Sequence, residues 1–511
     1  MMQMFSTEYV VEPVLIFGGG GEEKDPKKGL KRSGRFTYSG EEASLHKIRI
    51  GIIGNRLGID MTKDILDMLK KEIRTHHDRN EWLFPSYPGM NNKSKLNCTI
   101  ATPDIMVAQI SDLQLKKITG KRFSGARARI AFGVDLFAKK VQELVMDDDK
   151  PDVIICTLPK IVEINCGISE KTREAKAMTW LDRKVGKLRT RGQTFLTDPE
   201  FMPDYEESVS FDFRNSLKGK VLKSGVPIQI LQESTCDEIL HYAERGRHKS
   251  QDPCSFAWNF GTALLYKSNG RPWRLAKLAQ DTCYVGVSFF RDKLNPRKDM
   301  QTSMAQMFLH TGEGLVLRGG DVDSDEHTRM PYLKRDQASS LLSRAIDLYK
   351  KKAGHVPGRV VVHKTTELTP DERDGFNAAI LQKDIFRRDL VTVSYDRLGL
   401  NFMRTGQFPP LRGTMIHLGT YNFLLYSSGF TTQVRTYPGH SIPTPLNIRH
   451  EGDSDSMTIA REILGLTKLN WNTASFSTAL PITIKFATEV GKVLSELPDK
   501  EMPEASYRFF M

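Results

Sequence analysis

Gly465-Leu466-Thr467-Lys468-Leu469-Asn470-Trp471-Asn472 and Ala479-Leu480-Pro481-Ile482-Thr483 stand close together near the end of the chain. Before them, a strand-like segment ends in Tyr437-Pro438-Gly439-His440-Ser441-Ile442-Pro443-Thr444-Pro445-Leu446. A helix is predicted from about Ser456, and Pro481 is typical of the first turn of a closing helix. The chain therefore ends in an ordered series of strand, helix, turn and helix.

The composition is that of a folded, basic protein. Of the 511 residues, 39% are apolar and 27% are charged, which excludes a largely disordered chain. This length is enough for roughly two to four domains of ordinary size. The net charge of +12 favours a polyanionic partner because Lys and Arg contacts to phosphates release condensed counterions. Many basic proteins bind no nucleic acid, so charge alone does not decide the partner.

Cysteine usage and the N-terminus indicate the compartment. Cys156 and Cys283 lie in apolar strand-like runs, where cysteine acts as a small buried hydrophobe, and no Cys-x-x-Cys pair occurs. A reducing, intracellular environment is the natural inference. The N-terminus has no secretion signal, and no apolar run approaches the ~20 residues that span a bilayer. We therefore expect a soluble, cytoplasmic protein without a membrane partner. The cysteines are Cys98, Cys156, Cys166, Cys236, Cys254 and Cys283.

Strands alternate with helices in the first half of the chain. Strands are predicted at 47–54, 152–156 and 226–231, and helices with one apolar face at 60–73 and 127–145. This alternation is typical of a parallel, Rossmann-like sheet in an α/β fold.

Two glycine patterns have to be weighed against a nucleotide cofactor. Gly51, Gly54 and Gly58 do not form the dinucleotide-binding fingerprint. The run of four glycines that opens the stretch Gly18 to Arg35 is not followed by a phosphate-loop pattern, so a flexible connection is the expected structure there.

The second half predicts a mixed sheet. A hairpin is expected from residues 304–309 and 315–318, and Asp336 is placed to cap a helix that reaches Lys352. A strand at 359–363 leads to Thr369, where an N-cap Thr, a Pro and a Glu three residues on form a helix start signal. With a strand at 390–395, this order is that of an RNase H-like sheet. Fold order alone does not establish function.

The C-terminal series resembles the end of the PIWI domain of Argonaute proteins, and the chain as a whole resembles the short prokaryotic Argonautes, which keep only the MID and PIWI domains. The resemblance implies a Rossmann-like MID domain with an N-terminal segment at 1–275 and an RNase H-like PIWI domain at 276–511. It leaves no room for the N and PAZ domains of long Argonautes. Its further segments are 12–17, 50–54, 227–231, 265–267, 272–273 and 412–414.

The resemblance implies a pocket for the 5′-phosphate of a guide. Arg214 and Lys218 lie four residues apart and would share one helix face, while Gln229 and Lys267 fall at the matching later positions. Arg and Lys both suit a phosphate, although the same spacing is common on solvated helix faces. Family members often add a divalent ion and the terminal carboxylate, so Mg²⁺ and the carboxylate of Met511 are expected at this phosphate.

At two positions this chain lacks the metal-binding aspartates that active PIWI domains use as nuclease residues. Ser288 and Thr365 stand where the resemblance places the first two metal-binding aspartates, and neither can replace a carboxylate as a Mg²⁺ ligand. Asp292 as a relocated ligand is the open alternative. The acidic residues that could resemble the family's glutamate finger are Asp321, Asp323, Asp325 and Glu326. Near the fourth catalytic position stand Asn470 and Asn472.

These observations and the resemblance imply a guide-binding Argonaute that does not cut. By resemblance, a small guide RNA with a 5′-phosphate pairs with complementary single-stranded DNA of an invader. The chain would then activate a separate effector that carries an APAZ region and a TIR, sirtuin-like or nuclease domain, and assembly into a higher oligomer on activation is compatible with this scheme. The segment Val10 to Phe17 is expected to contribute to the effector interface. An autonomous guided endonuclease with rewired metal ligands and a nucleotide-dependent enzyme are the alternatives.

Overall fold

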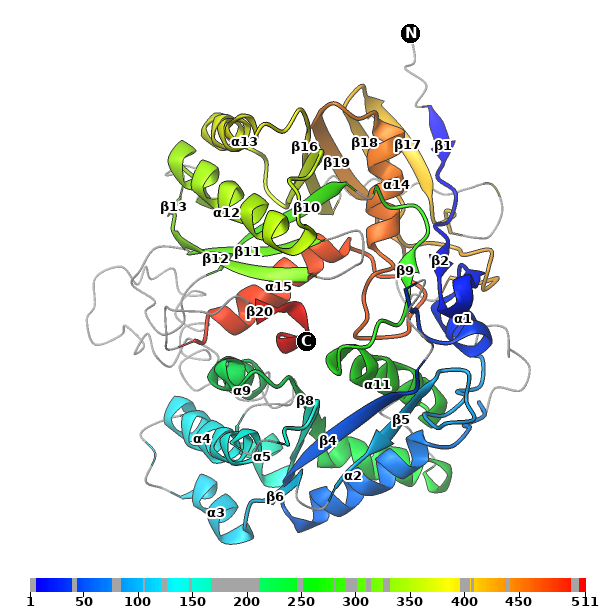
Figure 1. The fold of residues 1–511 in the computed structure, drawn as a ribbon, viewed down its shortest axis with the longest axis vertical. Coiled ribbons are helices and arrows are strands. Elements are labelled where there is room, and N and C mark those ends of the chain that lie inside the picture. The colour runs from blue at the N-terminus through cyan, green and yellow to red at the C-terminus, as the bar shows by residue number, and fades with distance from the viewer. Residues whose placement is uncertain are drawn as a thin grey trace, which may run out of the picture.

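Two sheets organise the chain, and helices cover both faces of each (Figure 1). They belong to a computed structural model, in which the described residues are 6–38, 44–75, 84–103, 106–120, 123, 126–146, 149–166, 211–245, 251–279, 281–290, 301–308, 314–324, 331–395, 405, 409–437, 442–497 and 505–511. None of the helices in these ranges is both long and apolar enough to cross a membrane.

The first sheet is parallel, as predicted, in the order β5-β4-β7-β8 with β6 beside β4. The three strands expected from the sequence are β4, β7 and β8, and the two expected helices are α2 and α4. The elements are β4 His46–Gly54, α2 Arg56–Leu69, β5 Cys98–Ala101, β6 Val107–Gln109, α3 Asp112–Lys116, α4 Ala126–Val145, β7 Val153–Leu158, α5 Lys160–Asn165, α9 Phe213–Val221, β8 Ile228–Gln232, α10 Glu233–Leu240 and α11 Pro253–Lys267.

The second sheet has ten strands in the order β1-β17-β18-β19-β16-β15-β10-β11-β12-β20. Along the chain, the hairpin β11–β12, helix α12, strand β15, helix α13 and strand β16 follow one another in the predicted RNase H-like order. The hairpin of β11 and β12 is antiparallel, while β15 runs parallel to β10 and to β16. The elements are β10 Thr282–Phe290, β11 Gln301–Phe308, β12 Gly314–Asp321, β13 Asp323–Ser324, β14 Pro331–Tyr332, α12 Arg335–Ala353, β15 Arg359–Lys364, α13 Pro370–Gln382, β16 Arg387–Tyr395, β17 Thr414–Gly419, β18 Asn422–Leu425, β19 Leu446–Gly452, α14 Ser456–Leu466, α15 Ile482–Leu494 and β20 Ala505–Ser506.

Local signals fix most of these boundaries. Thr369 caps α13 and forms the predicted capping box with Glu372. Asp336 is not the cap of α12, because the helix already begins at Arg335 and Asp336 lies in its first turn. Of the segment predicted to end a strand before Leu446, the described residues Tyr437 and 442–445 lie in no strand, and β19 begins at Leu446. Residues 438–441 of that segment lie outside the described ranges.

One apolar core is continuous between the two sheets. It contains Ile48 and Trp258 from the first half and Val393, Ile463 and Trp471 from the second, all at most 2% exposed. Two further cores lie on the outer faces, one under α4 and α9 and the other under α12 and α13. Because burial of apolar area stabilises roughly in proportion to that area, the shared core holds the two halves together.

The N-terminal segment belongs to both halves of the molecule. Strand β1 (Thr7–Tyr9) pairs with β17 at the edge of the ten-stranded sheet, and β2 (Leu15–Ile16) pairs with β9 (Arg274–Leu275). The stretch Gly18 to Arg35, expected as a flexible connection, instead forms a 3-10 turn, β3 (Glu22–Glu23) and helix α1 (Pro26–Ser33). Asp25 caps α1 by accepting from the backbone of Lys27, and Pro26 takes the first helical position, which is an ordinary helix start.

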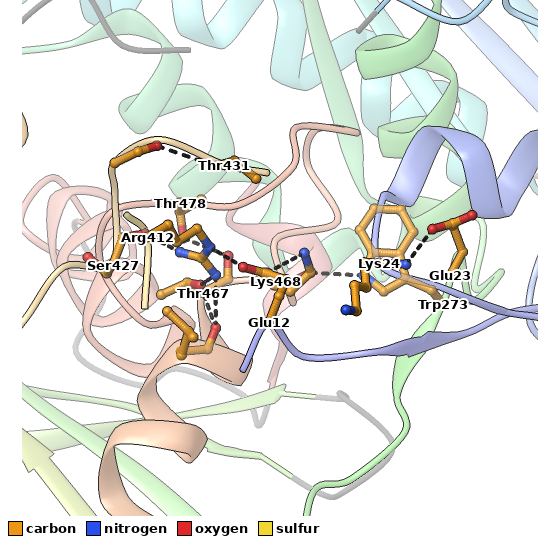
Figure 2. A network of polar contacts seen from close by, with 12 residues as sticks. Glu12, Glu23, Lys24, Trp273, Arg412, Ser427, Thr431, Thr467, Lys468 and Thr478 are labelled. Atoms are coloured by element: carbon orange, nitrogen blue, oxygen red, sulfur yellow. Dashed lines mark hydrogen bonds and ion pairs between the residues drawn. The ribbon is translucent and has the colours of Figure 1, made fainter. Parts of the chain in front are cut away.

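A buried ionic junction fixes the N-terminal segment (Figure 2). Glu12 accepts from Arg412 Nε at 2.9 Å and from Lys468 Nζ at 2.8 Å, and all three side chains are at most 2% exposed. Arg412 also donates to Thr467 Oγ1 at 2.8 Å and to the backbone of Ser427. Trp273 Nε1 donates to the Lys468 carbonyl at 2.9 Å. Segments from three parts of the chain therefore meet at one carboxylate, and Trp273 joins them through the Lys468 carbonyl.

Burial and charge act against each other in this junction. Burial alone would raise the pKa of Glu12, but the two cations outweigh it and hold this pKa below its ordinary value. Burial lowers the pKa of Lys468 to about 8, and Glu12 opposes that shift without cancelling it. One carboxylate thus compensates two buried cations only in part.

A second buried group, His363, sits where β15 packs on α15. The imidazole is 1% exposed, and its Nδ1 lies 2.7 Å from Thr483 Oγ1 at the start of α15. Burial, assisted by the nearby Arg359 charge, lowers the pKa of His363 to about 3, so the ring is neutral in the folded chain.

Glu12→Gln is expected to lower the free energy of unfolding by about 3–5 kcal/mol, because it leaves two buried cations without their carboxylate. Chemical denaturation monitored by circular dichroism measures this. Glu367→Gln is the matched control: its partner Arg449 and Glu367 itself are 54% and 74% exposed, so a change of at most about 1 kcal/mol is expected. Equal effects of the two substitutions would contradict the central role of the junction.

His363 predicts a loss of stability in acid. Above pH 6.5 the imidazole is neutral in both states; as the pH falls from 6.5 toward 3, the unfolded chain takes up a proton that the folded chain refuses. This contributes up to about 1.4 kcal/mol of destabilisation per pH unit. His363→Asn should flatten the pH dependence of unfolding between pH 6.5 and 5, whereas His355→Asn, at a side chain 57% exposed, should not. Identical slopes in wild type and His363→Asn would contradict the assignment.

Candidate functional site

Helix α9 carries the first two predicted pocket residues. Asp212 caps the helix by accepting from the Arg214 backbone at 2.8 Å, and the helix continues to Val221, so Arg214 and Lys218 do lie one turn apart. Phe213 and Leu217 bury the opposite face in the core under α4. The Arg214 side chain is exposed and Lys218 is half-buried, which leaves both able to reach a ligand at the edge of the helix.

Lys267 lies at the end of helix α11 rather than at the end of a strand, as its sequence neighbours suggested. Its ammonium group is 1% exposed and donates to the Ile228 carbonyl at 2.7 Å, to Gln229 Oε1 at 2.7 Å and to the Met511 oxygen at 3.0 Å. These three bonds use all three donors of a lysine. Gln229 is the only side chain among the acceptors, and it is neutral.

Lys218 joins the same site from the other side. Its Nζ donates to the Phe510 carbonyl at 3.2 Å, one residue before Met511. The structure therefore brings Lys218, Gln229, Lys267 and Met511 together, with the exposed Arg214 one turn along α9 from Lys218. We call this group the lysine pocket.

Burial disfavours the charged forms of both lysines in the lysine pocket. Burial lowers the pKa of Lys267 well below its ordinary value, and the neighbouring Lys218 adds to the shift. Burial also lowers the pKa of Lys218 to about 8, an effect that Glu489 opposes and Arg214 reinforces. A bound anion would favour the charged forms of both amines, so the site is electrostatically suited to a phosphate.

The ligand expected for the predicted Mg²⁺ is the carboxylate of Met511. The Met511 oxygen accepts a hydrogen bond from Lys267 Nζ, as does the neighbouring Gln229 Oε1. Among the described residues, no cluster of three or more His, Cys, Asp or Glu side chains could hold a metal ion. As arranged, these oxygens do not fit a Mg²⁺ ion, which prefers an octahedron of free oxygen ligands, and no step below uses one. The ion stays a prediction.

Ser288 lies within β10, and Thr365 directly follows the neighbouring strand β15. The last register pair of β10 and β15 is Val287 with Lys364, and the two residues follow that pair directly. Ser288 Oγ donates to the Ala487 carbonyl in α15 at 3.0 Å, whereas Thr365 is exposed.

The other acidic candidates are placed less fully. Asp321 ends β12 and Asp323 begins β13, while Asp292, Asp325 and Glu326 lie outside the described residues. Asn470 and Asn472 hold a local turn: the Asn472 backbone donates to Asn470 Oδ1 at 3.3 Å, and Asn470 Nδ2 lies 3.4 Å from Thr473 Oγ1.

Several contributors to these sites carry no sequence signal. The Ile228 and Phe510 carbonyls act through the backbone, so their side chains do not reveal them. Glu496 was not predicted either. It follows α15 in the sequence and contacts the start of α9 in space. Residues 280 positions apart meet there, and no local pattern predicts such a contact.

Comparisons with known proteins rest on structure alone. No protein-family model matches the chain, and no curated protein matches its sequence. The Argonaute of Clostridium butyricum, solved with a guide DNA and a 19-mer target DNA, is similar with a TM-score of 0.61 and 15% identity over 98% of this chain and 54% of that one. The Argonaute of A. aeolicus gives a TM-score of 0.55 and 13% identity over 98% of this chain and 54% of that one. For Drosophila Piwi the TM-score is 0.55 and the identity 13%, over 96% and 54%.

The match covers nearly all of this chain, which spans about half the length of these Argonautes. It includes both sheets, the parallel one with the lysine pocket and the mixed one with Ser288 and Thr365. At such low identity the similarity shows the fold and leaves the activity open. The chain has the fold of Argonaute proteins, in the form of their MID and PIWI domains.

Proposed function

We propose that this chain binds the 5′-phosphorylated end of a small guide RNA, pairs the guide with complementary single-stranded DNA and leaves that DNA uncut. The observation that carries the proposal is that Lys218 and Lys267 reach the neighbouring residues Phe510 and Met511, which brings two cations to one site. Arg214 and the net charge of +12 would extend attraction to the following phosphates. The guide and target DNA bound by the Clostridium butyricum Argonaute support the proposal by analogy of fold.

The absence of cutting rests on Ser288 and Thr365. Two-metal hydrolysis needs carboxylates that hold two ions ~3.5–4 Å apart, and a hydroxyl supplies no anionic ligand. A PIWI cleft that carries Ser288 and Thr365 in place of aspartates would hold a guide–target duplex without hydrolysing it.

A protein that recognises a target and does not cut it needs another source of output. We include in the proposal a separate APAZ-containing effector, with a TIR, sirtuin-like or nuclease domain, that acts in prokaryotic immunity in the cytoplasm. In the N-terminal segment most apolar side chains are already buried within the chain, but Tyr9 and Val11 are 46% and 66% exposed. Tyr9, in the edge strand β1, and Val11, two residues beyond it, would offer apolar contacts to the partner.

Charge reversal of Arg214 and Lys218 together is expected to weaken binding of a 5′-phosphorylated guide by at least about two orders of magnitude, because charge-assisted contacts to phosphate contribute roughly 1.5–3 kcal/mol each. Filter binding at fixed salt, with RNA and DNA guides carrying a 5′-phosphate or a 5′-hydroxyl, measures this. Charge reversal of Lys220 and Lys350, both exposed and outside the pocket, changes the net charge equally and is the control. Equal loss in both double variants would remove the pocket assignment.

Loaded with guide and complementary target in Mg²⁺ or Mn²⁺, the purified chain is expected to leave the target intact on a denaturing gel. Discrete cleavage opposite a fixed guide position would favour the alternative of a rewired endonuclease. Loss of that cleavage on substituting Asp292 would then identify the relocated ligand.

Co-expression with the product of the adjacent gene, followed by size-exclusion chromatography, is expected to give one complex whose interface buries at least ~1,000 Å² and survives moderate salt. Val11→Asp, which puts a charge on the exposed apolar contact, should weaken the complex, whereas Leu113→Asp, at another exposed apolar residue, should not. Two separate peaks, with target binding by this chain undiminished, would refute the partnership.

A further inference from the structure

Glu496 is buried at the contact between the two halves of the chain. It follows helix α15 and is 4% exposed. Its carboxylate accepts from the Asp212 backbone N–H at 3.0 and 3.1 Å and from Ser216 Oγ at 2.5 Å. All of these donors belong to the first turn of α9 or to its cap. A carboxylate from the second half of the chain therefore holds the start of the helix that carries Arg214 and Lys218.

The charge of Glu496 suits this position. The first turn of a helix presents backbone N–H groups without helical partners, and the helix dipole places partial positive charge there. Glu496 satisfies one such group directly and binds a hydroxyl one turn along. Bonds to a charged acceptor are shorter and stronger than neutral ones, so this contact restrains where α9 begins.

A second contact fixes the far part of the same helix. A Cβ added at Gly219 would lie 3.2 Å from Leu497 Cγ and 3.4 Å from Leu497 Cδ2, so α9 packs tightly on Leu497, which would have to shift by a few tenths of an ångström to admit a side chain. Gly219 directly follows Lys218. The helix is thus held at its first turn by Glu496 and near its end by packing on Leu497.

The position of α9 sets the position of the Lys218 amine. Lys218 Nζ reaches the Phe510 carbonyl at 3.2 Å, beside the Met511 oxygen that Lys267 contacts. Lys267 is anchored independently by the Ile228 carbonyl and Gln229. A shift of α9 would therefore move Lys218 relative to Lys267 and spoil the spacing of the two cations around a phosphate.

We propose that Glu496 is a positioning residue for the 5′-phosphate of the guide: its carboxylate sets α9 so that the Lys218 amine faces the phosphate beside the buried charge of Lys267. This inference rests on the proposed function. It assigns to the second half of the chain a role in reading the guide end, exerted through α9 rather than by contact with the guide.

The test compares affinities of the full-length chain for the same RNA guide with a 5′-phosphate and with a 5′-hydroxyl; their ratio isolates the phosphate. Glu496→Ala should reduce the ratio about tenfold, the equivalent of one charge-assisted hydrogen bond. Glu496→Gln keeps an acceptor oxygen and should reduce it less. Gly219→Val pushes α9 away from Leu497 and should reduce the ratio without touching Glu496.

Glu451→Ala, at an exposed glutamate on β19, is the control. Thermal melting of each variant reports folding, and if Glu496→Ala does not melt cooperatively, Glu496→Gln and Gly219→Val decide.

A reduced ratio in the Glu496 and Gly219 variants, with unchanged affinity for the hydroxyl guide, supports the proposal. Wild-type ratios in those variants overturn it and leave the lysine pocket standing. Equal losses for both guides also overturn it, because they indicate general damage. A wild-type chain that does not distinguish the two guides refutes the proposed function itself, and the role of Glu496 with it.

Discussion

One carboxylate shared by two buried cations holds this fold together. Glu12 cannot be neutralised without leaving Arg412 and Lys468 uncompensated in the core, and neither cation can be removed without changing the balance for the other two. The three residues come from the N-terminal segment, the loop before β17 and the segment after α14. Through the Lys468 carbonyl, Trp273 adds the connection between the two halves. The short stretches that carry the resemblance to Argonautes include all four of these residues.

The lysine pocket depends on the same framework. Trp471, three residues after Lys468, packs on Tyr266 with ring centroids 4.9 Å apart, and Tyr266 precedes Lys267 at the end of α11. From the other direction, α15 contacts Ser288 and His363 along its length and ends beside α9. Both lysines of the pocket are therefore supported by residues of the mixed sheet's half. Neither half presents the pocket alone.

Sequence patterns predicted the elements whose signals are local. The parallel strands, the capping box at Thr369 and the apolar faces of α2 and α4 all appear as expected, because period and capping act within a few residues. Helix α1 was missed although Asp25 and Pro26 form a normal start, since the preceding glycines suggested a loop. Lys267 lies beside Gln229 and Met511 as expected, but it ends a helix and not a strand. The pocket residues themselves came from the resemblance and not from the spacing of Arg214 and Lys218, which is common on solvated helices. Glu496 could not be predicted, because its partners are 280 positions away.

The burial of every cysteine has a practical consequence. All six cysteines are buried and none forms a disulfide, and burial raises the pKa of Cys98, Cys156 and Cys236 to about 12. Thiolates are the reactive form, so maleimide reagents near neutral pH should leave the native cysteines unmodified. A single cysteine introduced at an exposed site, such as Met146 at 83% exposure, would then carry a fluorophore in the otherwise unaltered chain. Motions between the two halves could be followed by spectroscopy without first rebuilding the core.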